Sequence, residues 1–439
     1  MATSRSQAIT HASFTVPGQP RQPVVLGYQV LLDGKAVIHR LARELSPEAA
    51  DLIEIATTVY AVDQMVARPR RQQLDSGASW AREIRLEIPV RLPGTWDALA
   101  SSLATLLAWL TDDSWELDFG HRGEGFGPLD TRQGFLFDTV PHRVATVLFS
   151  GGLDSAAGLA AWLARGDAVA VSVDTNNWMQ HVQQAVLRDL NAVSAHRCVP
   201  LRYRVSRRAQ KHSAESSQRS RGLLFLAVGI ATAWTLGHDR LQVFENGIGA
   251  INLPYTLAQF GSQSARAMHP KTLRMAQELA SAISGRLFRI DAPGMKLTKG
   301  QLIQAAPVAA DGALAGSVSC DTGFSARVLE HMPCGTCTSC LLRRQALHAA
   351  GRSRLDMRAG YRSSSIESSF ALQAMLWQVS RLRTCLDGED PWRTLVLEYP
   401  ELLDATLLTP TEVIELYRSY VREWDQFPQA LRIGRTAAL

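Results

Sequence analysis

The sequence has no hydrophobic run long enough to cross a membrane. Its longest apolar stretch, Leu223 to Leu236, falls short of the roughly 20 residues that a membrane-spanning helix needs and indicates a buried helix. The first twenty residues are polar and contain no apolar segment of the kind found in secretory signals. With 46% hydrophobic and 20% charged residues, the composition is that of an ordinary globular protein. We therefore expect a cytoplasmic protein.

An excess of charge of one sign is also missing, and cysteine is scarce. The formal net charge is +5, too small a bias to indicate a dedicated nucleic-acid binder, although a local basic run extends from Arg202 to Arg221. The sequence therefore allows a nucleic-acid partner but does not indicate one. Of the 6 cysteines in 439 residues, four cluster, which favours a metal site in a reducing compartment over a disulfide framework.

The sequence lacks a Walker A motif but carries a different phosphate-binding pattern. The pattern is Ser150-Gly151-Gly152-Leu153-Asp154-Ser155. It lies between a β-branched run (144–149) and a helical segment (156–163), where glycines, free N–H groups and the helix dipole favour a phosphate. Ser150 and Ser155 can donate to phosphate oxygens, and the carboxylate of Asp154 implies an intervening Mg²⁺. An incidental turn between strand and helix is the alternative.

The length predicts two or three domains. We expect a disordered leader over residues 1–22 and a separate α+β domain over 23–135. Residues 141–352 alternate strands and helices, which predicts a doubly wound parallel sheet with the phosphate-binding loop at the carboxyl edge of its first strand. Residues 353–439 predict a C-terminal helical extension.

Periodicity predicts the main elements of these domains. Strands are expected at 27–32, 84–90, 144–149, 168–173, 200–205 and 241–244. Helices are expected at 47–56, 96–110, 223–236 and 369–382. Ser46 before Pro47 supplies the N-cap of the first of these helices.

The cysteine cluster has the spacing of a metal site. Cys334, Cys337 and Cys340 form C-x2-C-x2-C, and Cys320 lies upstream. Four thiolates suit tetrahedral Zn²⁺. A [4Fe–4S] cluster is the alternative, because ferredoxins use the same spacing. The upstream position of the fourth cysteine and the lack of a following Cys-Pro favour zinc; free buried thiols are the remaining alternative.

The two motifs together resemble a known family. The six-residue motif is similar to the PP-loop of N-type ATP pyrophosphatases, and its combination with the cysteines resembles the 7-cyano-7-deazaguanine synthases, the QueC family. The zinc site of that family ends in C-G-x-C-x-x-C-x-L-R, which residues 334–343 match. Residues 297–301 (Leu-Thr-Lys-Gly-Gln) resemble its L-T-K-x-E element. Residues 219–221 (Arg-Ser-Arg) resemble its P-x-R-N loop without the Pro and Asn.

This resemblance covers roughly residues 142–352 and implies a fold, a reaction and its metals. The implied fold is that of the PP-loop ATP pyrophosphatases (adenine nucleotide α-hydrolase-like), with ATP as substrate and Mg²⁺ and Zn²⁺ as metals. The implied reaction adenylates the carboxylate of 7-carboxy-7-deazaguanine and releases pyrophosphate; ammonia then gives an amide, and a second adenylation gives the nitrile. The residues implied in catalysis are Asp154, Lys299, Arg219 and Arg221, with Lys296 a further positive candidate. Those implied in ATP binding are Ser150, Gly151, Gly152, Leu153, Asp154, Ser155 and Asp174.

The expected substrate loop departs from the family pattern. After the fourth strand the family has an Asp-containing loop and a Y-P-D-C/S-R stretch, whereas residues 245–254 here contain no aspartate. Glu245 is a candidate reader of a guanine-like base edge. The resemblance therefore supports the use of ATP by this chain better than it supports the identity of the second substrate.

Four functional hypotheses follow. Extensions at both ends resemble the long QueC-like proteins of bacterial antiphage (Qat) operons, which implies adenylation serving the modification of a partner macromolecule, docked through these extensions and encoded in the same operon. Synthesis of 7-cyano-7-deazaguanine (preQ0) for queuosine is the alternative with a small-molecule acceptor. A nucleotide-binding scaffold without turnover is the third. The fourth, tRNA thiolation, needs a free catalytic thiol, for which Cys198 is the candidate.

Overall fold

The computed structural model of this protein describes most of the chain. The described residues are 9–69, 77, 79–122, 127–130, 144–175, 177–207, 214–215, 217–256, 265–321, 332–357, 360–363, 366 and 369–427. Residues 1–8 of the expected leader and the expected domain boundaries at 135 and 141 lie outside these residues.

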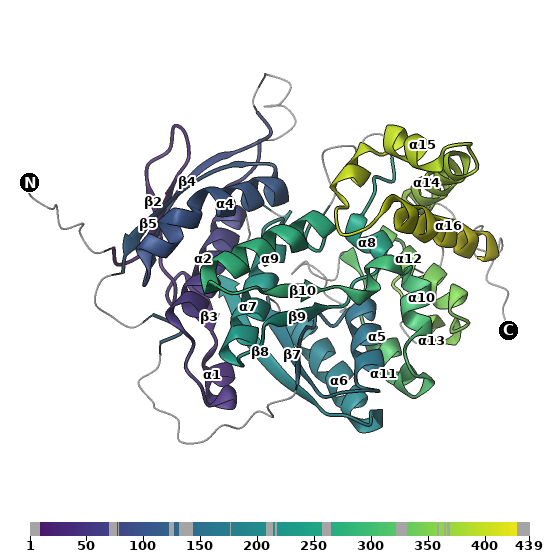
Figure 1. Ribbon diagram of the computed structural model, residues 1–439, viewed down its shortest axis with the longest axis horizontal. Coiled ribbons are helices and arrows are strands. Elements are labelled where there is room, and N and C mark those ends of the chain that lie inside the picture. Colours follow the sequence, from purple (N-terminus) through teal and green to yellow (C-terminus); the bar gives the residue numbers. More distant parts are fainter. Residues whose placement is uncertain are drawn as a thin grey trace, which may run out of the picture.

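A sheet of six strands forms the centre of the molecule (Figure 1). Its strand order is β10 (Arg289–Asp291), β9 (Arg240–Val243), β6 (Ala145–Leu148), β7 (Ala168–Asp174), β8 (Cys198–Arg207) and β3 (Val30–Asp33). The first five strands are parallel, and β3 is antiparallel to β8. From β6 the chain adds β7 and then β8 on one side of the strand, and it later adds β9 and β10 on the other side. The strand order therefore reverses between β6 and β9. Open α/β sheets bind ligands at such a point, beyond the carboxyl ends of the strands.

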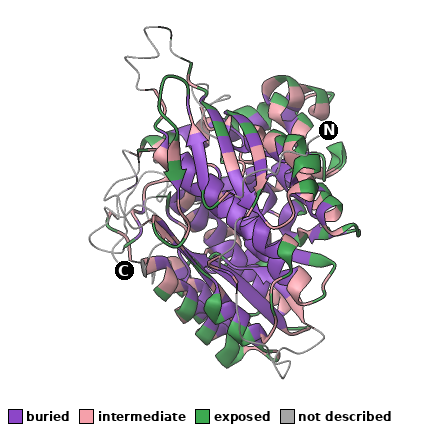
Figure 2. Cartoon of the chain, turned by 90° about the vertical axis from the view of Figure 1, so that its left-hand side faces the viewer, coloured by how far each residue is buried: buried purple, intermediate pink, exposed green. Residues whose placement is uncertain are grey.

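Alternating side chains of the strands fill two separate cores, one on each face of the sheet. Val147 and Ala170 belong to one buried cluster, whereas their neighbours Leu148 and Val171 belong to another. This is the period-2 pattern of strands that are covered on both faces. Figure 2 shows the buried strands between helices whose outer surfaces are exposed. The expectation of a doubly wound parallel sheet is confirmed.

Helices cover both faces of this sheet. The core on one face includes residues of α5 (Leu153–Trp162), α6 (Asn177–Val193), α10 (Lys299–Gln304), η3 (Val308–Ala310), α11 (Asp311–Gly316), α12 (Thr338–Ala349) and α13 (Arg354–Met357). The core on the other includes residues of α1 (Lys35–Leu41), α2 (Pro47–Met65), α7 (Arg221–Thr235), α9 (Pro270–Ser284) and η2 (Pro293–Lys296). Helix α7 is buried almost all round because it lies between the sheet and α2, as its uninterrupted apolar sequence predicts.

The N-terminal region forms a second, four-stranded sheet. The order is β2 (Gln22–Val24), β1 (Ala12–Thr15), β4 (Glu83–Val90) and β5 (Ser114–His121), with α4 (Pro93–Thr111) as the crossover between the parallel strands β4 and β5. The prediction of a disordered leader through residue 22 is wrong for the described part. Phe14 is only 2% exposed, and β1 pairs with both β2 and β4, so the segment is held by burial and by two ladders of hydrogen bonds.

The expectation that this N-terminal region is a separate unit is also wrong. Strand β3 extends the central sheet, with Leu32 opposite Val205, and α2 packs against α7. Residues of both sheets share one hydrophobic core. Ser46 caps α2 as expected, but the helix continues to Met65, beyond the predicted end at 56.

A buried acid joins the two regions. Asp63 of α2 is fully buried and accepts hydrogen bonds from the backbone N of Ser220 at 3.0 Å and from its hydroxyl at 2.7 Å. Ser220 is the N-cap residue of α7. A residue of the N-terminal region thus accepts the hydrogen bonds of the N-cap residue of a helix that covers the central sheet. Arg82 completes the network, with Nη2 2.6 Å from Asp63 Oδ1.

The C-terminal region is helical, as predicted, and is seen at the upper right of Figure 1. It consists of α14 (Phe370–Leu386), α15 (Pro391–Glu398), η5 (Pro400–Asp404) and α16 (Pro410–Gln426). Its core includes Ile248 and Ile251 of α8 (Gly247–Ile251) and Leu341 and Leu342 of α12. The helices therefore pack directly on α8, which follows β9, and on α12, which contains Cys340 of the cysteine cluster.

We predict that Asp63→Ala lowers the free energy of unfolding by about 3–5 kcal/mol, because it leaves a buried charge on Arg82 with one partner fewer and an unsatisfied N–H at the start of α7. Denaturant unfolding measures the loss. The matched control is Asp118→Ala, which removes an exposed ion pair with Arg85 and should cost no more than about 1 kcal/mol. Equal losses for the two variants would contradict the assigned role of Asp63.

Candidate functional site

The expected phosphate-binding motif, residues 150–155, forms the turn between β6 and α5. Gly151 has a φ of +83°, a conformation that residues with a side chain rarely adopt. A Cβ at this position would also lie 2.9 Å from the Gln183 side chain. Gly152 is the N-cap residue of α5. The motif thus has the strand–turn–helix geometry expected from the sequence, at the carboxyl edge of the sheet.

The two serines of the motif bond within the loop. Ser150 Oγ accepts a hydrogen bond from the N of Gly152 at 3.2 Å and lies 3.1 Å from Ser155 Oγ. Ser155 Oγ donates to the carbonyl of Gly152 at 3.0 Å. These bonds stabilise the shape of the turn. Donation by the two hydroxyls to a phosphate requires them to reorient and stays a prediction.

Asp154 is the centre of a buried polar cluster. It lies in the first turn of α5 and is 6% exposed. Lys299 Nζ is 2.6 Å from Oδ2, and Asn246 Nδ2 donates to the same oxygen at 2.9 Å. The other oxygen, Oδ1, accepts no hydrogen bond from a described amide, amine or hydroxyl. A buried carboxylate oxygen without a donor is a natural ligand for a hard cation, so the residues present fit Mg²⁺.

Glu245 lies beside Asp154 and titrates with it. Burial alone would raise the pKa of Asp154, but the Lys299 ammonium and the hydrogen bonds that Asp154 receives hold its pKa below the ordinary value. Burial, followed by the negative charge of Asp154, raises the pKa of Glu245 well above its ordinary value. Asp154 is therefore ionised at neutral pH, and Glu245 holds its proton to a higher pH than an ordinary carboxyl group does. Two carboxyl groups in contact need a proton or a cation between them, so this pair is compatible with a cation site.

Three separate segments bring this cluster together. Asp154 follows β6, Glu245 and Asn246 follow β9, and Lys299 begins α10 after the capping residue Thr298. The cluster lies at the point where the strand order reverses. The structure thus brings Lys299 to Asp154, as the resemblance implied. Asn246 was not among the predicted site residues; its only signal in the sequence is its position three residues after a buried strand.

Asp174 ends β7, the strand next to β6, and is 5% exposed. Arg202 Nε lies 2.9 Å from its Oδ2, whereas Oδ1 accepts no hydrogen bond from a described residue. Burial raises the pKa of Asp174 to about 6, despite the opposing charges of Arg202 and Arg204. Its place at the carboxyl edge agrees with the expected nucleotide-binding edge, and its contact with a nucleotide stays a prediction.

The two arginines at the start of α7 have partners outside this cluster. Arg219 Nη1 is 2.6 Å from Asp112 Oδ2, and its guanidinium lies over the ring of Trp80 at 4.7 Å. The guanidinium of Arg221 lies over the ring of Phe225, and burial lowers the pKa of Arg221. These contacts connect Arg219 to the N-terminal region. A role in catalysis stays a prediction for both residues.

The four clustered cysteines form a compact site. The Sγ atoms of Cys320, Cys334, Cys337 and Cys340 all lie within 4.8 Å of one another. Backbone N–H groups donate to the sulfurs: Cys334 N to Cys320 Sγ and Cys337 N to Cys334 Sγ, each at 3.3 Å. Four thiolates this close fit one tetrahedral ion such as Zn²⁺, whereas a four-iron cluster would hold its ligands further apart.

The segment that leads into this site also holds the phosphate-binding loop. Val318 N donates to the carbonyl of Gly151 at 3.1 Å, and Leu153 N donates to Ser319 Oγ at 3.3 Å. Cys320 follows immediately in the chain. A metal bound by the cysteines would therefore fix the backbone that supports the loop, which is a structural role.

Cys198 has the environment of a core residue. It is 4% exposed at the start of β8, and its N and O bond the side chain of Asn191. Burial raises the pKa of its thiol to about 12. A catalytic thiol needs a lowered pKa, so the environment of Cys198 argues against the tRNA thiolation hypothesis.

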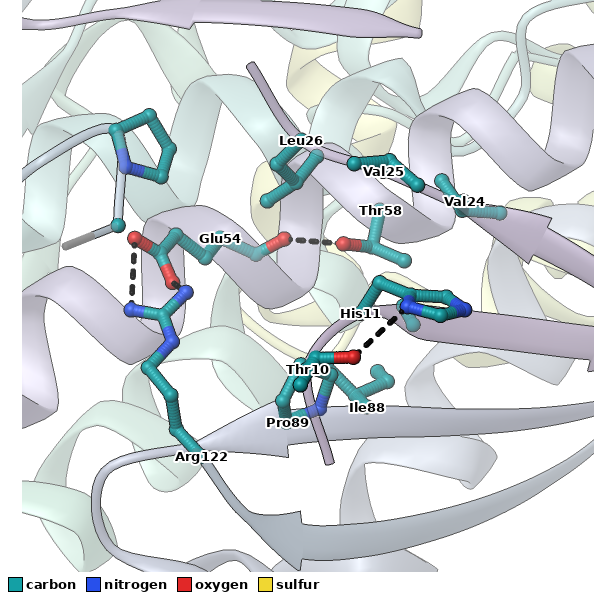
Figure 3. A pocket seen from close by; sticks show the side chains of 13 residues that line it. Thr10, His11, Val24, Val25, Leu26, Glu54, Thr58, Ile88, Pro89 and Arg122 are labelled. Atoms are coloured by element: carbon teal, nitrogen blue, oxygen red, sulfur yellow. Dashed lines mark hydrogen bonds and ion pairs between the residues drawn. The ribbon is translucent and has the colours of Figure 1, made fainter. Parts of the chain in front are cut away.

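A cavity of about 130 Å³ lies in the N-terminal region (Figure 3). Its charged lining residues are Glu54 and Arg122, which pair with an Nη2 to Oε2 distance of 2.5 Å. Thr58 Oγ1 donates to the backbone O of Glu54 at 2.8 Å. The polar side chains of this cavity therefore have hydrogen-bond or ion-pair partners of their own, whereas Oδ1 of Asp154 has no amide, amine or alcohol donor among the described residues. We therefore place the candidate site at the phosphate-binding loop and not in this cavity.

Known proteins similar to this chain agree with the geometry. Residues 220–351 match the family model described as queuosine biosynthesis protein QueC. The 7-cyano-7-deazaguanine synthase of Methylobacillus flagellatus is 31% identical over 226 residues, which are 48% of this chain and 93% of that relative. The chain belongs to the QueC family. In this QueC-family chain the family-model match contains Lys299 and the four cysteines, whereas the phosphate-binding loop lies upstream of it.

The comparisons thus confirm the expected QueC-like family. The described helices of this QueC-family chain include none with the length and apolar character needed to span a bilayer.

We predict that Cys337→Ser loses the metal, from about one zinc ion per chain to none, and lowers the melting temperature, because a three-cysteine site binds weakly and metal binding contributes to folding. Elemental analysis and thermal unfolding measure both effects. Cys385→Ser is the control, since Cys385 is in the C-terminal core and outside the cluster. Iron in place of zinc in the wild type would contradict the tetrahedral zinc assignment.

A second prediction concerns the dependence of stability on pH. Because Asp174 has a pKa near 6 in the folded protein and near 3.8 as the ordinary value, the folded state binds more protons between these values. The free energy of unfolding should therefore fall, by up to about 3 kcal/mol, as the pH rises from about 4 to about 6, and level off above that. Asp174→Asn should remove this fall, and the exposed Asp239→Asn should keep it. Identical pH profiles for wild type and Asp174→Asn would refute the assignment.

Proposed function

We propose that this protein is an ATP-dependent enzyme that adenylates a carboxylate and releases pyrophosphate and then AMP. The observation that carries the proposal is the buried cluster of Asp154, Lys299 and Asn246 on a phosphate-binding loop at the reversal point of the sheet. A buried ion pair is costly to retain unless it is well satisfied, and here one carboxylate oxygen has no amide, amine or alcohol donor among the described residues. That arrangement suits a site completed by a metal-bound triphosphate.

Each residue has a distinct part in the proposed reaction. Ionised Asp154 would hold Mg²⁺, which neutralises charge on the leaving pyrophosphate when bound. Lys299 stabilises negative charge that develops on the phosphates, and the N–H groups at the start of α5 orient them. The substrate carboxylate attacks the α-phosphorus, the bond to the pyrophosphate oxygen breaks, and an acyl adenylate forms. Ammonia then attacks the acyl carbon, AMP leaves, and loss of a proton gives the amide.

The nature of the acceptor is the second part of the proposal. The similar protein from Methylobacillus flagellatus is named for 7-cyano-7-deazaguanine synthesis, and a second ATP-dependent activation of the amide, followed by loss of AMP, would give that nitrile here too. The aligned residues make up 48% of this chain. The regions outside the alignment are surfaces on which a protein partner can dock, and they favour a macromolecular acceptor in antiphage defence. Synthesis of the small-molecule nitrile is the second candidate, favoured by the relative's name.

We expect purified protein with Mg-ATP, ammonium and 7-carboxy-7-deazaguanine to produce AMP and pyrophosphate, together with the amide or nitrile. Asp154→Asn should lower the rate about 100-fold or more without unfolding the protein, and Lys299→Met should act in the same direction, because both remove charge that the transition state requires. Mass spectrometry of the small molecules and a pyrophosphate assay measure these outcomes. Asp189→Asn on the exposed face of α6 is the control.

The outcomes separate the hypotheses. AMP formation together with the amide or nitrile of the small acceptor would establish QueC-type chemistry. AMP formation only after addition of a partner protein encoded beside it would establish a macromolecular acceptor. ATP binding without AMP under any of these conditions would favour the scaffold, and turnover by Asp154→Asn at the wild-type rate would refute the proposed site.

A further inference from the structure

Lys299 depends for its position on a helix far away in the sequence. Its segment is capped by Thr298, whose Oγ1 accepts from the N of Gln301 at 3.1 Å, while Gln301 Oε1 accepts from the N of Thr298 at 2.9 Å. The same Thr298 hydroxyl donates to Glu423 Oε1 of α16. Because the hydroxyl has one proton, donating it to Glu423 turns its lone pairs toward Gln301. Glu423 therefore fixes the orientation of the cap from which Lys299 extends.

The other oxygen of Glu423 is held by a third element. Gln345 of α12 donates from Nε2 to Glu423 Oε2 at 3.1 Å, and Gln345 is fully buried. Glu423 therefore accepts two hydrogen bonds, one from each neighbouring segment. A carboxylate with both oxygens bonded in this way has little freedom to move.

The packing around Glu423 is close. A Cβ at Gly300, directly after Lys299, would lie 2.6 Å from Glu423 Oε1 and 3.1 Å from Ala349 Cβ. Helix α16 also reaches the second partner of Asp154: a Cβ at Gly247, directly after Asn246, would lie 2.6 Å from Leu416 Cδ2. Two segments that supply side chains to Asp154 are thus packed against the same C-terminal helix.

We propose that Glu423 is a positioning residue for the proposed adenylation, and that α16 is part of the active-site architecture because it holds the segment that presents Lys299 to Asp154. This inference rests on the proposed function. Glu423 lies outside the family-model match, which ends at residue 351. The C-terminal region therefore has a catalytic consequence besides any docking of a partner.

The first test uses Glu423→Ala and the isosteric Glu423→Gln. The alanine variant frees Thr298 and Gln345, so Lys299 should lose its fixed place and kcat should fall about 10- to 100-fold, with a smaller change in KM for ATP. The glutamine variant should retain most of the activity. Its carbonyl can accept from Thr298 and its amide can donate to Gln345 Oε1, which has no partner among the described residues. The comparison of the two variants therefore separates the effect of losing these hydrogen bonds on kcat from the effect of losing the negative charge.

The second test measures the accessibility of Lys299 to a chemical label and does not require catalytic turnover. Lys299 is 7% exposed and paired with Asp154, so it should resist acylation by an amine-reactive reagent in wild type and in Glu423→Gln. It should become labelled at least several-fold faster in Glu423→Ala, measured by peptide mass spectrometry. Glu415→Ala, an exposed position of the same helix, is the control and should leave labelling unchanged.

The outcomes distinguish this inference from the proposed function. If the wild type forms no AMP with any acceptor, the proposed function fails, and labelling still decides whether Glu423 positions Lys299. If the wild type is active and Glu423→Ala retains both its kcat and the protection of Lys299, the inference alone is overturned. Should Glu423→Ala fail to fold, Gly300→Ala, whose methyl group displaces the Glu423 carboxylate, replaces it: faster labelling and a lower kcat support the inference, and wild-type values overturn it.

Discussion

The contact between Lys299 and Asp154 is the constraint on which the rest of the site depends. A carboxylate and an ammonium that are each less than a tenth exposed lose most of their hydration, and this is tolerated only when geometry and neighbouring hydrogen bonds compensate. Asn246 supplies one such bond. Burial and the charge of Asp154 raise the pKa of Glu245, which disfavours a second negative charge beside Asp154. The ion pair therefore requires β6, β9 and α10 to be held in one fixed arrangement.

Both terminal regions contribute to that arrangement, which is why neither is an independent appendage. In the N-terminal region, Asp63 accepts hydrogen bonds from Ser220, the N-cap residue of α7. Strand β3 of the same region adds an edge strand beside β8 of the central sheet. In the C-terminal region, α16 packs on α8 and bonds the cap of α10. A metal held by the cysteines would restrain the phosphate-binding loop, because the backbone before Cys320 bonds that loop. Every segment that surrounds Asp154 is thus restrained by a part of the chain distant in sequence.

The sequence predicts the local parts of this structure and misses the distant ones. The strand–loop–helix around Gly151 and the cysteine spacing follow from short motifs, because neighbouring residues alone determine them. The pairing of β3 with β8 and the donation from Thr298 to Glu423 depend on which remote segments meet, and no local pattern encodes that choice. The prediction of a disordered leader is wrong for a related reason in the described part: Pro17 and Pro20 favour disorder locally, whereas burial of Phe14 and pairing on both sides of β1 outweigh them.

The unsatisfied groups of the site are themselves an argument for a ligand. Three buried oxygens near the loop accept no hydrogen bond from a described amide, amine or hydroxyl: Asp154 Oδ1, Asp174 Oδ1 and Gln183 Oε1. Gln183 also bonds the carbonyl of Ser150 through its other amide atom, so its free oxygen lies beside the loop. Each such acceptor costs about 1–3 kcal/mol when nothing donates to it. A chain that retains three such oxygens at this edge of the sheet forgoes stability there, and a nucleotide with its metal would supply the donors and the cation that these oxygens lack.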